Sequence, residues 1–176
     1  MMLPLSKPVR HVVLVGLMGS GKTTVGSRLA AALDWPWHDS DAEIETATGL
    51  SVRELPDRDG VDAMHGVEAA HLLHALAEPG QSVIGAAASV VDAESCRSAL
   101  SAPDLAIIWL RASPDVLAGR FRAEPHRPMF GSSPRDFLEQ QANRREPLIG
   151  ELDPIVIDVD EISPDEAVAR VLDTLR

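Results

Sequence analysis

The chain has 176 residues, of which 45% are hydrophobic and 24% are charged, and its net charge is −11. This length fits a single domain, residues 1–176, with a hydrophobic core of its own. The acidic balance would repel a nucleic-acid backbone, so we expect no nucleic-acid partner. The apolar runs are too short to span a membrane, and residues 1–10 lack the features of a secretory signal. We therefore expect a cytoplasmic protein without a membrane partner.

Cys96 is the single cysteine of the chain. A lone cysteine excludes an internal disulfide and fits a reducing compartment. We interpret Cys96 as a small packed residue rather than a nucleophile, because no activating group is visible around it in the sequence. We also expect a monomer, because no extended apolar repeat requires a partner.

Short apolar runs alternate with helical patterns along the chain, which is typical of βαβ units and a parallel sheet. Strands are predicted at residues 11–15, 35–38, 82–85, 105–110 and 155–158. Helices are predicted at residues 22–34, 40–48, 60–78, 92–101, 113–123, 133–146 and 164–176. Ser113-Pro114 and Ser163-Pro164 are typical helix starts. The three tryptophans flank predicted strands and are interpreted as core residues: Trp35, Trp37 and Trp109.

A phosphate-binding loop connects the first predicted strand to the first predicted helix. Residues 16–23 read GLMGSGKT, which matches the pattern G-x-x-x-x-G-K-[ST] in the context that it requires. Glycines let backbone N–H groups cradle phosphate oxygens, and the following helix adds its positive end. Lys22 can reach the β- and γ-phosphates, and the Thr23 hydroxyl can bind Mg²⁺. The glycine spacing is not that of a dinucleotide-binding loop. The pattern predicts a nucleoside triphosphate site.

Two carboxylates, Asp39 and Asp41, follow the second predicted strand. Ligands bind beyond the carboxyl ends of parallel strands, so both should point toward the site. One can hold the water of a metal ion, and the other can orient a substrate hydroxyl. Capping of the next helix by Ser40 or Asp41 is an alternative that is compatible with this role.

Arginines concentrate in the second half of the chain. Seven of the sixteen basic residues lie between Arg111 and Arg145, and all seven are arginines, which suit phosphates and carboxylates. Residues 122–134 contain three prolines and a glycine, and we predict a lid over the phosphates there. A plain surface connection is the alternative.

Histidines recur with an acid on the third long helix: His65, Glu68, His71 and His74. The three-residue steps could suggest a metal site, but no H-E-x-x-H pair exists. We interpret these positions as a solvated helix face. His65 itself is either a helix-surface histidine or a proton donor in an acceptor site.

At this point the chain resembles shikimate kinase, a small relative of the nucleoside monophosphate kinases. The resemblance rests on GLMGSGKTTVG, on DSDAEIE and TGLSVREL, and on Gly60, Glu68, Arg127-Pro128 and the REPL that begins at Arg145. It extends over nearly the whole chain. It implies a three-layer α/β/α P-loop NTP hydrolase-type fold with a five-stranded parallel sheet in the order 2-3-1-4-5 and a lid.

The resemblance also implies the roles of individual residues. ATP would bind at Gly19, Ser20, Gly21, Lys22, Thr23, Thr24 and Arg120, with Arg120 against the adenine. Thr23 and Asp39 would support Mg²⁺. Asp41 would position the attacking hydroxyl, Arg127 would close over the γ-phosphate, and Arg145 would pair with the substrate carboxylate. Catalysis would then rest on Lys22, Asp41 and Arg127.

The acceptor-binding region, residues 39–75 with later segments, departs from the pattern of this family. His65 replaces an arginine that would grip the carboxylate of shikimate, and Ala86, Ala87 and Ala88 replace three glycines. Added methyl groups narrow a pocket, and alanine disfavours positive φ. We expect an ATP- and Mg²⁺-dependent kinase that phosphorylates a hydroxyl group of a small polar metabolite. Another acceptor (polyol, amino alcohol or nucleotide), or a nucleotide-binding protein without transfer, are the alternatives.

Overall fold

Five parallel strands form one sheet in the order β2-β3-β1-β4-β5, as predicted. The computed structural model describes residues 8–52, 54–123 and 133–176. The strands are β1 (His11–Val15), β2 (Trp37–Asp39), β3 (Ser82–Gly85), β4 (Leu105–Arg111) and β5 (Ile155–Asp158). The helices are α1 (Lys22–Leu33), α2 (Ser40–Thr48), α3 (Glu54–Asp59), α4 (Val61–Ala77), α5 (Glu94–Leu100), α6 (Pro114–Ala123), α7 (Pro134–Gly150) and α8 (Pro164–Leu175), with a 3₁₀ turn η1 (Ala88–Asp92).

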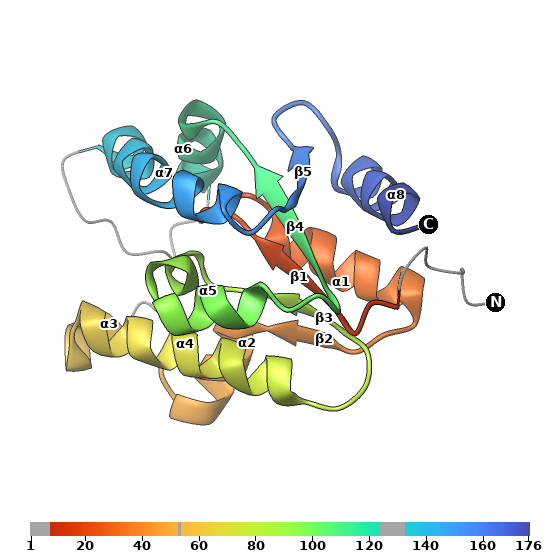
Figure 1. The fold of residues 1–176 in the computed structure, drawn as a ribbon. Coiled ribbons are helices and arrows are strands. Elements are labelled where there is room, and N and C mark those ends of the chain that lie inside the picture. Colours follow the sequence, from red (N-terminus) through yellow and green to blue (C-terminus); the bar gives the residue numbers. More distant parts are fainter. Residues whose placement is uncertain (1–7, 53, 124–132) are drawn as a thin grey trace.

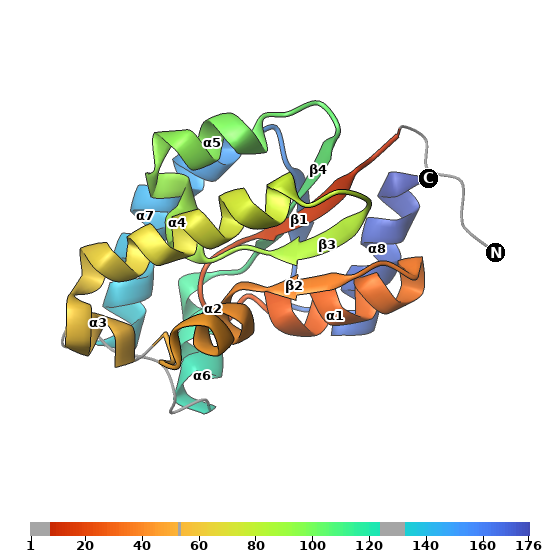
Figure 2. The same cartoon turned by 90° about the horizontal axis from the view of Figure 1, so that it is seen from below.

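Helices cover both faces of the sheet, which gives the three layers (Figures 1 and 2). In Figure 2, α1 and α8 lie on one side of the strands, and α4 and α5 lie on the other. Alternate residues of β1 enter the two cores: Leu14 packs with the first pair of helices and Val13 with the second. Such a strand is buried on both faces, which is why its sequence is continuously apolar.

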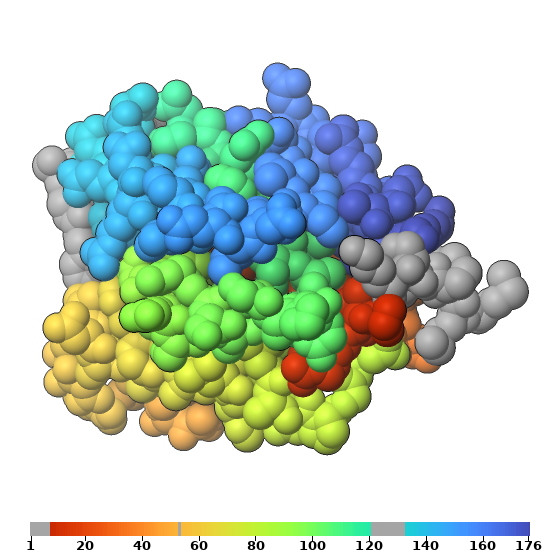
Figure 3. Space-filling view, viewed as in Figure 1, coloured from red at the N-terminus to blue at the C-terminus, as the bar shows by residue number. Residues whose placement is uncertain are grey.

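The face with α4 and α5 is closed by helices packed side by side. In Figure 3, atoms of α5 lie between those of α4 and those of α7. Cys96 of α5 is fully buried there, and burial raises the pKa of its thiol, so the interpretation as a packed residue is confirmed. Across the described part of the chain, no helix has both the length and the apolar character needed to cross a bilayer.

The tryptophans belong to the core, as predicted. Trp109 is buried on β4, and Trp35 and Trp37 pack against the first core cluster. The Trp37 ring also leaves no room for a side chain at Gly26 or Gly85. A Cβ at these positions would lie 2.2 and 2.5 Å, respectively, from the ring. The ring therefore fits only between a bare α1 backbone and a bare β3 backbone.

The structure corrects several predicted boundaries. Helix α3 was not predicted, although Ser51 and Glu54 form a reciprocal cap that signals a helix start: the Ser51 N–H donates to Glu54 Oε2 at 2.9 Å and the Glu54 N–H to Ser51 Oγ at 3.3 Å. Strand β2 begins two residues later than expected, at Trp37. Helix α7 continues past residue 146 to Gly150 with Pro147 inside it.

The predicted lid falls largely outside the described residues. Residues 124–132, including Arg127, are not described. The flanking ends of the predicted segment belong to helices instead, because α6 extends to Ala123 and α7 begins at Pro134 with Ser133 as its cap.

Candidate active site

The loop between β1 and α1 has the geometry of a phosphate cradle. Gly16, Gly19 and Gly21 have φ values of 147°, 83° and 96°, which side chains other than glycine rarely adopt. At Gly16 a Cβ would lie 2.6 Å from the carbonyl oxygen of Leu110, so the loop approaches β4 closely. The loop opens at the N-terminus of α1, whose unpaired N–H groups and positive end favour a phosphate.

Lys22 lies across this loop. Its Nζ donates to the carbonyl oxygens of Gly16 at 2.8 Å and Leu17 at 3.1 Å. The ammonium group is therefore held over the cradle in which phosphate oxygens would sit. This placement agrees with the predicted nucleotide site.

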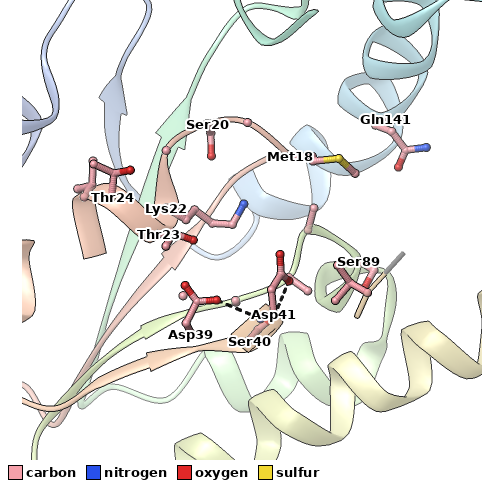
Figure 4. Close-up of a pocket in the computed structure, with 18 of the residues that line it drawn as sticks. Met18, Ser20, Lys22, Thr23, Thr24, Asp39, Ser40, Asp41, Ser89 and Gln141 are labelled. Atoms are coloured by element: carbon pink, nitrogen blue, oxygen red, sulfur yellow. Dashed lines mark hydrogen bonds between the residues drawn. The ribbon is translucent and has the colours of Figure 1, made fainter. Parts of the chain in front are cut away.

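One pocket of about 730 Å³ adjoins the loop and extends to α4 and α7. Every described residue predicted for the site lines it: Gly19, Ser20, Gly21, Lys22, Thr23, Thr24, Asp39, Asp41, His65, Ala86, Ala87, Ala88, Arg120 and Arg145. In Figure 4, Lys22 and Thr23 lie on the loop side, Asp39 and Asp41 lie opposite them, and Ser89 and Gln141 lie at the further end. Sequence elements separated by more than a hundred residues thus share one cavity.

Asp39 both caps a helix and lines the pocket. Its Oδ1 accepts hydrogen bonds from the backbone N–H groups of Asp41 at 3.1 Å and Ala42 at 3.4 Å, so Asp39 itself caps α2. The expected cap, Ser40 or Asp41, was wrong by one or two positions. Asp39 also lines the pocket with Thr23, and a carboxylate with a hydroxyl is the hard-oxygen donor set that Mg²⁺ prefers.

Arg120 of α6 lines the pocket and is hydrogen-bonded to the phosphate loop. Its Nη1 donates to the carbonyl oxygen of Gly19 at 3.2 Å and its Nη2 to that of Val159 at 2.8 Å. The guanidinium group thus joins the phosphate loop to the chain that follows β5. Five residues from that region line the pocket, although the sequence marked two of them, Ser163 and Pro164, only as a helix start: Val159, Ile162, Ser163, Pro164 and Ala167.

At the other end, the three alanines adopt no strained backbone. The described residues other than glycine with positive φ are Asp34 and Asp153, so Ala86, Ala87 and Ala88 are not among them. The expectation that alanine would be unfavourable here for its φ was wrong. Their methyl groups line the cavity instead, so their effect is on its shape.

His65 lines this same end from α4. Burial lowers the pKa of its imidazole, and the nearby Arg145 lowers it further. The ring is therefore neutral at pH 7 and can donate or accept one hydrogen bond without adding charge. His65 is a pocket residue rather than a helix-surface histidine.

Glu68 and His71 contradict the interpretation of α4 as a solvated face. Glu68 is 7% exposed and accepts a hydrogen bond from the Ser89 hydroxyl, and burial raises the pKa of its carboxyl group. His71 pairs with Glu43 of α2 at 2.7 Å between Nε2 and Oε2. Of the three histidines, His74 does face solvent. Helix α4 packs between α2 and η1, which a three-residue spacing alone cannot reveal.

Arg145 is buried in the pocket wall and held by an aspartate of η1. Its Nη2 and Nε lie 2.8 and 3.2 Å from Asp92 Oδ2. The neighbouring Arg144 also lines the pocket and faces the other oxygen of Asp92. Arg144 and Ser89 are pocket residues that the sequence did not predict, since no motif marks them and only the packing of α7 and η1 brings them to the site.

The fold and this site define a P-loop kinase: a parallel α/β sheet, a phosphate loop with its lysine, and an adjoining cavity for an acceptor. A family model described as shikimate kinase matches residues 18–176. The shikimate kinase of Ruegeria pomeroyi is 37% identical over 94% of this chain and 85% of its own length. The chain belongs to the shikimate kinase family.

Solved structures agree with this assignment. Shikimate kinase from Bacteroides thetaiotaomicron has a TM-score of 0.83 at 27% identity, covering 94% of this chain and 98% of that chain. Shikimate kinase from Acinetobacter baumannii, in complex with shikimate, shares the fold, with a TM-score of 0.85 at 24% identity over 93% of this chain and 91% of that chain. The chain is an ATP-dependent kinase that transfers the γ-phosphate to a hydroxyl group of a small polar metabolite.

Proposed function

We propose that the acceptor is shikimate and that transfer depends on Mg²⁺. The observation that carries this proposal is the continuity of the cavity from the phosphate loop to a basic wall at Arg145. A hydroxylated ring with a carboxylate could place its hydroxyl near Asp41 and its carboxylate near Arg145. The curated relatives that match most of this chain carry the name shikimate kinase, which supports the same acceptor.

The nucleotide-side roles follow from the residues around the loop. The loop amides and Lys22 would hold the β- and γ-phosphates, and Arg120 would lie against the base. Mg²⁺ bound at Thr23 and, through water, at Asp39 would neutralise charge on the phosphates. Catalysis would rest on positioning and on charge stabilisation by groups already in place.

On the acceptor side, Asp41 would orient the attacking hydroxyl and accept its proton. Asp41 lines the same cavity as Lys22, and both side chains are labelled in Figure 4. Glu68, Ala86, Ala87 and Ala88 would shape the pocket around the ring. The role of Arg127 stays a prediction, because that residue lies outside the described part of the chain.

We further propose that the protein acts as a monomer in the cytoplasm. The lone buried Cys96 fits a reducing compartment. Both substrates of the proposed reaction are small and water-soluble.

The test is ADP release coupled to a reporter enzyme, with ATP and Mg²⁺, comparing shikimate with polyols, amino alcohols and nucleosides. Saturable turnover that is specific to shikimate is expected. Turnover with another compound would refute the proposed acceptor. ATP binding without turnover on any compound would favour a nucleotide-binding protein that has lost transfer.

A further inference from the structure

Two adjacent arginines of α7 share one carboxylate at the acceptor end of the cavity. Asp92 Oδ2 receives hydrogen bonds from Arg145, while Asp92 Oδ1 lies 3.3 Å from Arg144 Nε. The side chain of Asp92 is 14% exposed, so the carboxylate and its contact with Arg145 are largely shielded from solvent. One carboxylate thus holds two guanidinium groups side by side.

The two arginines differ in what remains available to a ligand. The Arg145 side chain is 9% exposed and is fixed in the wall by two N–H donors. The Arg144 side chain is 64% exposed, and its contact with Asp92 is an ion pair without hydrogen-bond geometry, since Asp92 Oδ1 has no hydrogen-bond partner among the described residues. The N–H groups of Arg144 can therefore turn toward a ligand at little cost.

The charge at this end also favours an anion. Asp92 balances one of the two guanidinium charges, which leaves a net charge of about +1 from this trio at pH 7. His65 adds none, because burial and Arg145 lower the pKa of its imidazole. Three acids also line the cavity: Asp39 at the end of β2, Asp41 in α2 and Glu68 in α4. Glu68 accepts a hydrogen bond from the Ser89 hydroxyl of η1, and burial raises the pKa of its carboxyl group.

We propose that Arg144 is a specificity-determining residue that binds the carboxylate of the acceptor together with Arg145. A guanidinium group binds a carboxylate through paired, charge-assisted hydrogen bonds. Arg145 supplies a fixed hydrogen-bond donor, and the more exposed Arg144 side chain turns toward the ligand and donates further hydrogen bonds to its carboxylate. This role rests on the proposed function, because it requires an acceptor with a carboxylate.

The experiment compares Arg144→Gln and Arg144→Lys with the wild type, using shikimate and its uncharged carboxamide. Arg144→Gln should raise the KM for shikimate about tenfold and leave the KM for ATP and Tm unchanged. The KM of Arg144→Lys for shikimate should lie between those of the wild type and Arg144→Gln, because lysine keeps the charge but loses the paired hydrogen-bond geometry. With the carboxamide, wild type and Arg144→Gln should have the same KM. The matched control is Arg170→Gln, an exposed arginine of α8 outside the cavity.

A second variant tests whether the positive charge of Arg144 matters by moving that charge from α7 to α4. His65→Arg combined with Arg144→Gln places a guanidinium group on α4 in place of the one removed from α7. The double variant should recover most of the lost affinity for shikimate. A structural role of Arg144 would give no such recovery and no difference between the acid and its carboxamide.

The outcomes separate this inference from the proposed function. A KM for shikimate within twofold of wild type in Arg144→Gln overturns the inference while the function stands. Turnover of a different hydroxy acid, with the same dependence on Arg144, overturns the acceptor assignment and supports the inference. Turnover of an acceptor without a carboxylate, or of none, overturns both.

Discussion

The two ends of the cavity are built in different ways. The nucleotide end comes chiefly from one continuous stretch, residues 16–24, in which glycine conformations and a helix start create the cradle locally. The acceptor end is assembled from α4, η1 and α7, and it depends on a buried ion pair between residues 53 positions apart. Changes in the phosphate loop should therefore impair chemistry with little effect on folding, while changes in the buried pair of Asp92 and Arg145 should also lower the stability of the fold.

The largest effect is expected from Lys22→Met at the nucleotide end. Losing a preorganised charge at the transferring phosphoryl group should lower kcat by about 10²–10³-fold. Steady-state ADP release measures this, with Arg28→Gln, a surface ion-pair variant on the same helix, as the control. Full turnover in Lys22→Met would refute the assignment of the loop.

At the acceptor end, Asp92→Asn should mainly destabilise the fold. It leaves the buried Arg145 without its counter-charge, which should cost about 3 kcal/mol and lower Tm by roughly 6–12 °C. Thermal unfolding measures the change. The matched control is Asp173→Asn, whose ion pair with Arg176 is exposed and should be worth less than about 1 kcal/mol. Equal losses in both variants would contradict the contrast between the two ends.

Asp39 allows its two roles to be separated. Asparagine caps a helix as well as aspartate does, so Asp39→Asn should keep the stability within about 0.5 kcal/mol. Its weaker interaction with the metal should raise the Mg²⁺ concentration for half-maximal activity several-fold. Asp39→Ala should add a stability loss of about 1 kcal/mol, because the cap is then lost. An unchanged Mg²⁺ requirement in both variants would exclude Asp39 from the metal site.

The smallest effect concerns Glu68 and depends on pH. Burial raises the pKa of its carboxyl group above the usual value of about 4.5, so the folded state holds this proton more tightly than the unfolded state does. Its contribution to stability therefore falls as pH rises from the unfolded pKa through the folded pKa. Glutamine does not titrate, so Glu68→Gln should not lose stability in this way as the pH rises. The Tm of the variant minus the Tm of the wild type should therefore increase from pH 4.5 to pH 8. The exposed Glu139→Gln should show no such trend. A constant difference for Glu68→Gln would mean that the carboxyl group has the same pKa in the folded and unfolded states, which would contradict the effect of burial.

The sequence by itself determined the strands, the phosphate loop and the strand order expected of the family. These features follow from local causes: a strand buried on both faces is continuously apolar, and a loop with positive φ requires glycine. Helix α3 could also have been predicted, because its start is marked by the cap between Ser51 and Glu54.

Only the tertiary structure added Arg144 and Ser89 to the acceptor end and showed that His65, Glu68 and His71 do not form a solvated face. The spacing of His65, Glu68 and His71 is compatible with a solvated face, and nothing local marks Arg144 or Ser89 as pocket residues. Their roles depend on which side of α4 and α7 meets η1, and that is set by packing between distant elements. Burial then lowers the pKa of His65 and raises that of Glu68, because a pKa responds to the surroundings in space and not to neighbours in sequence.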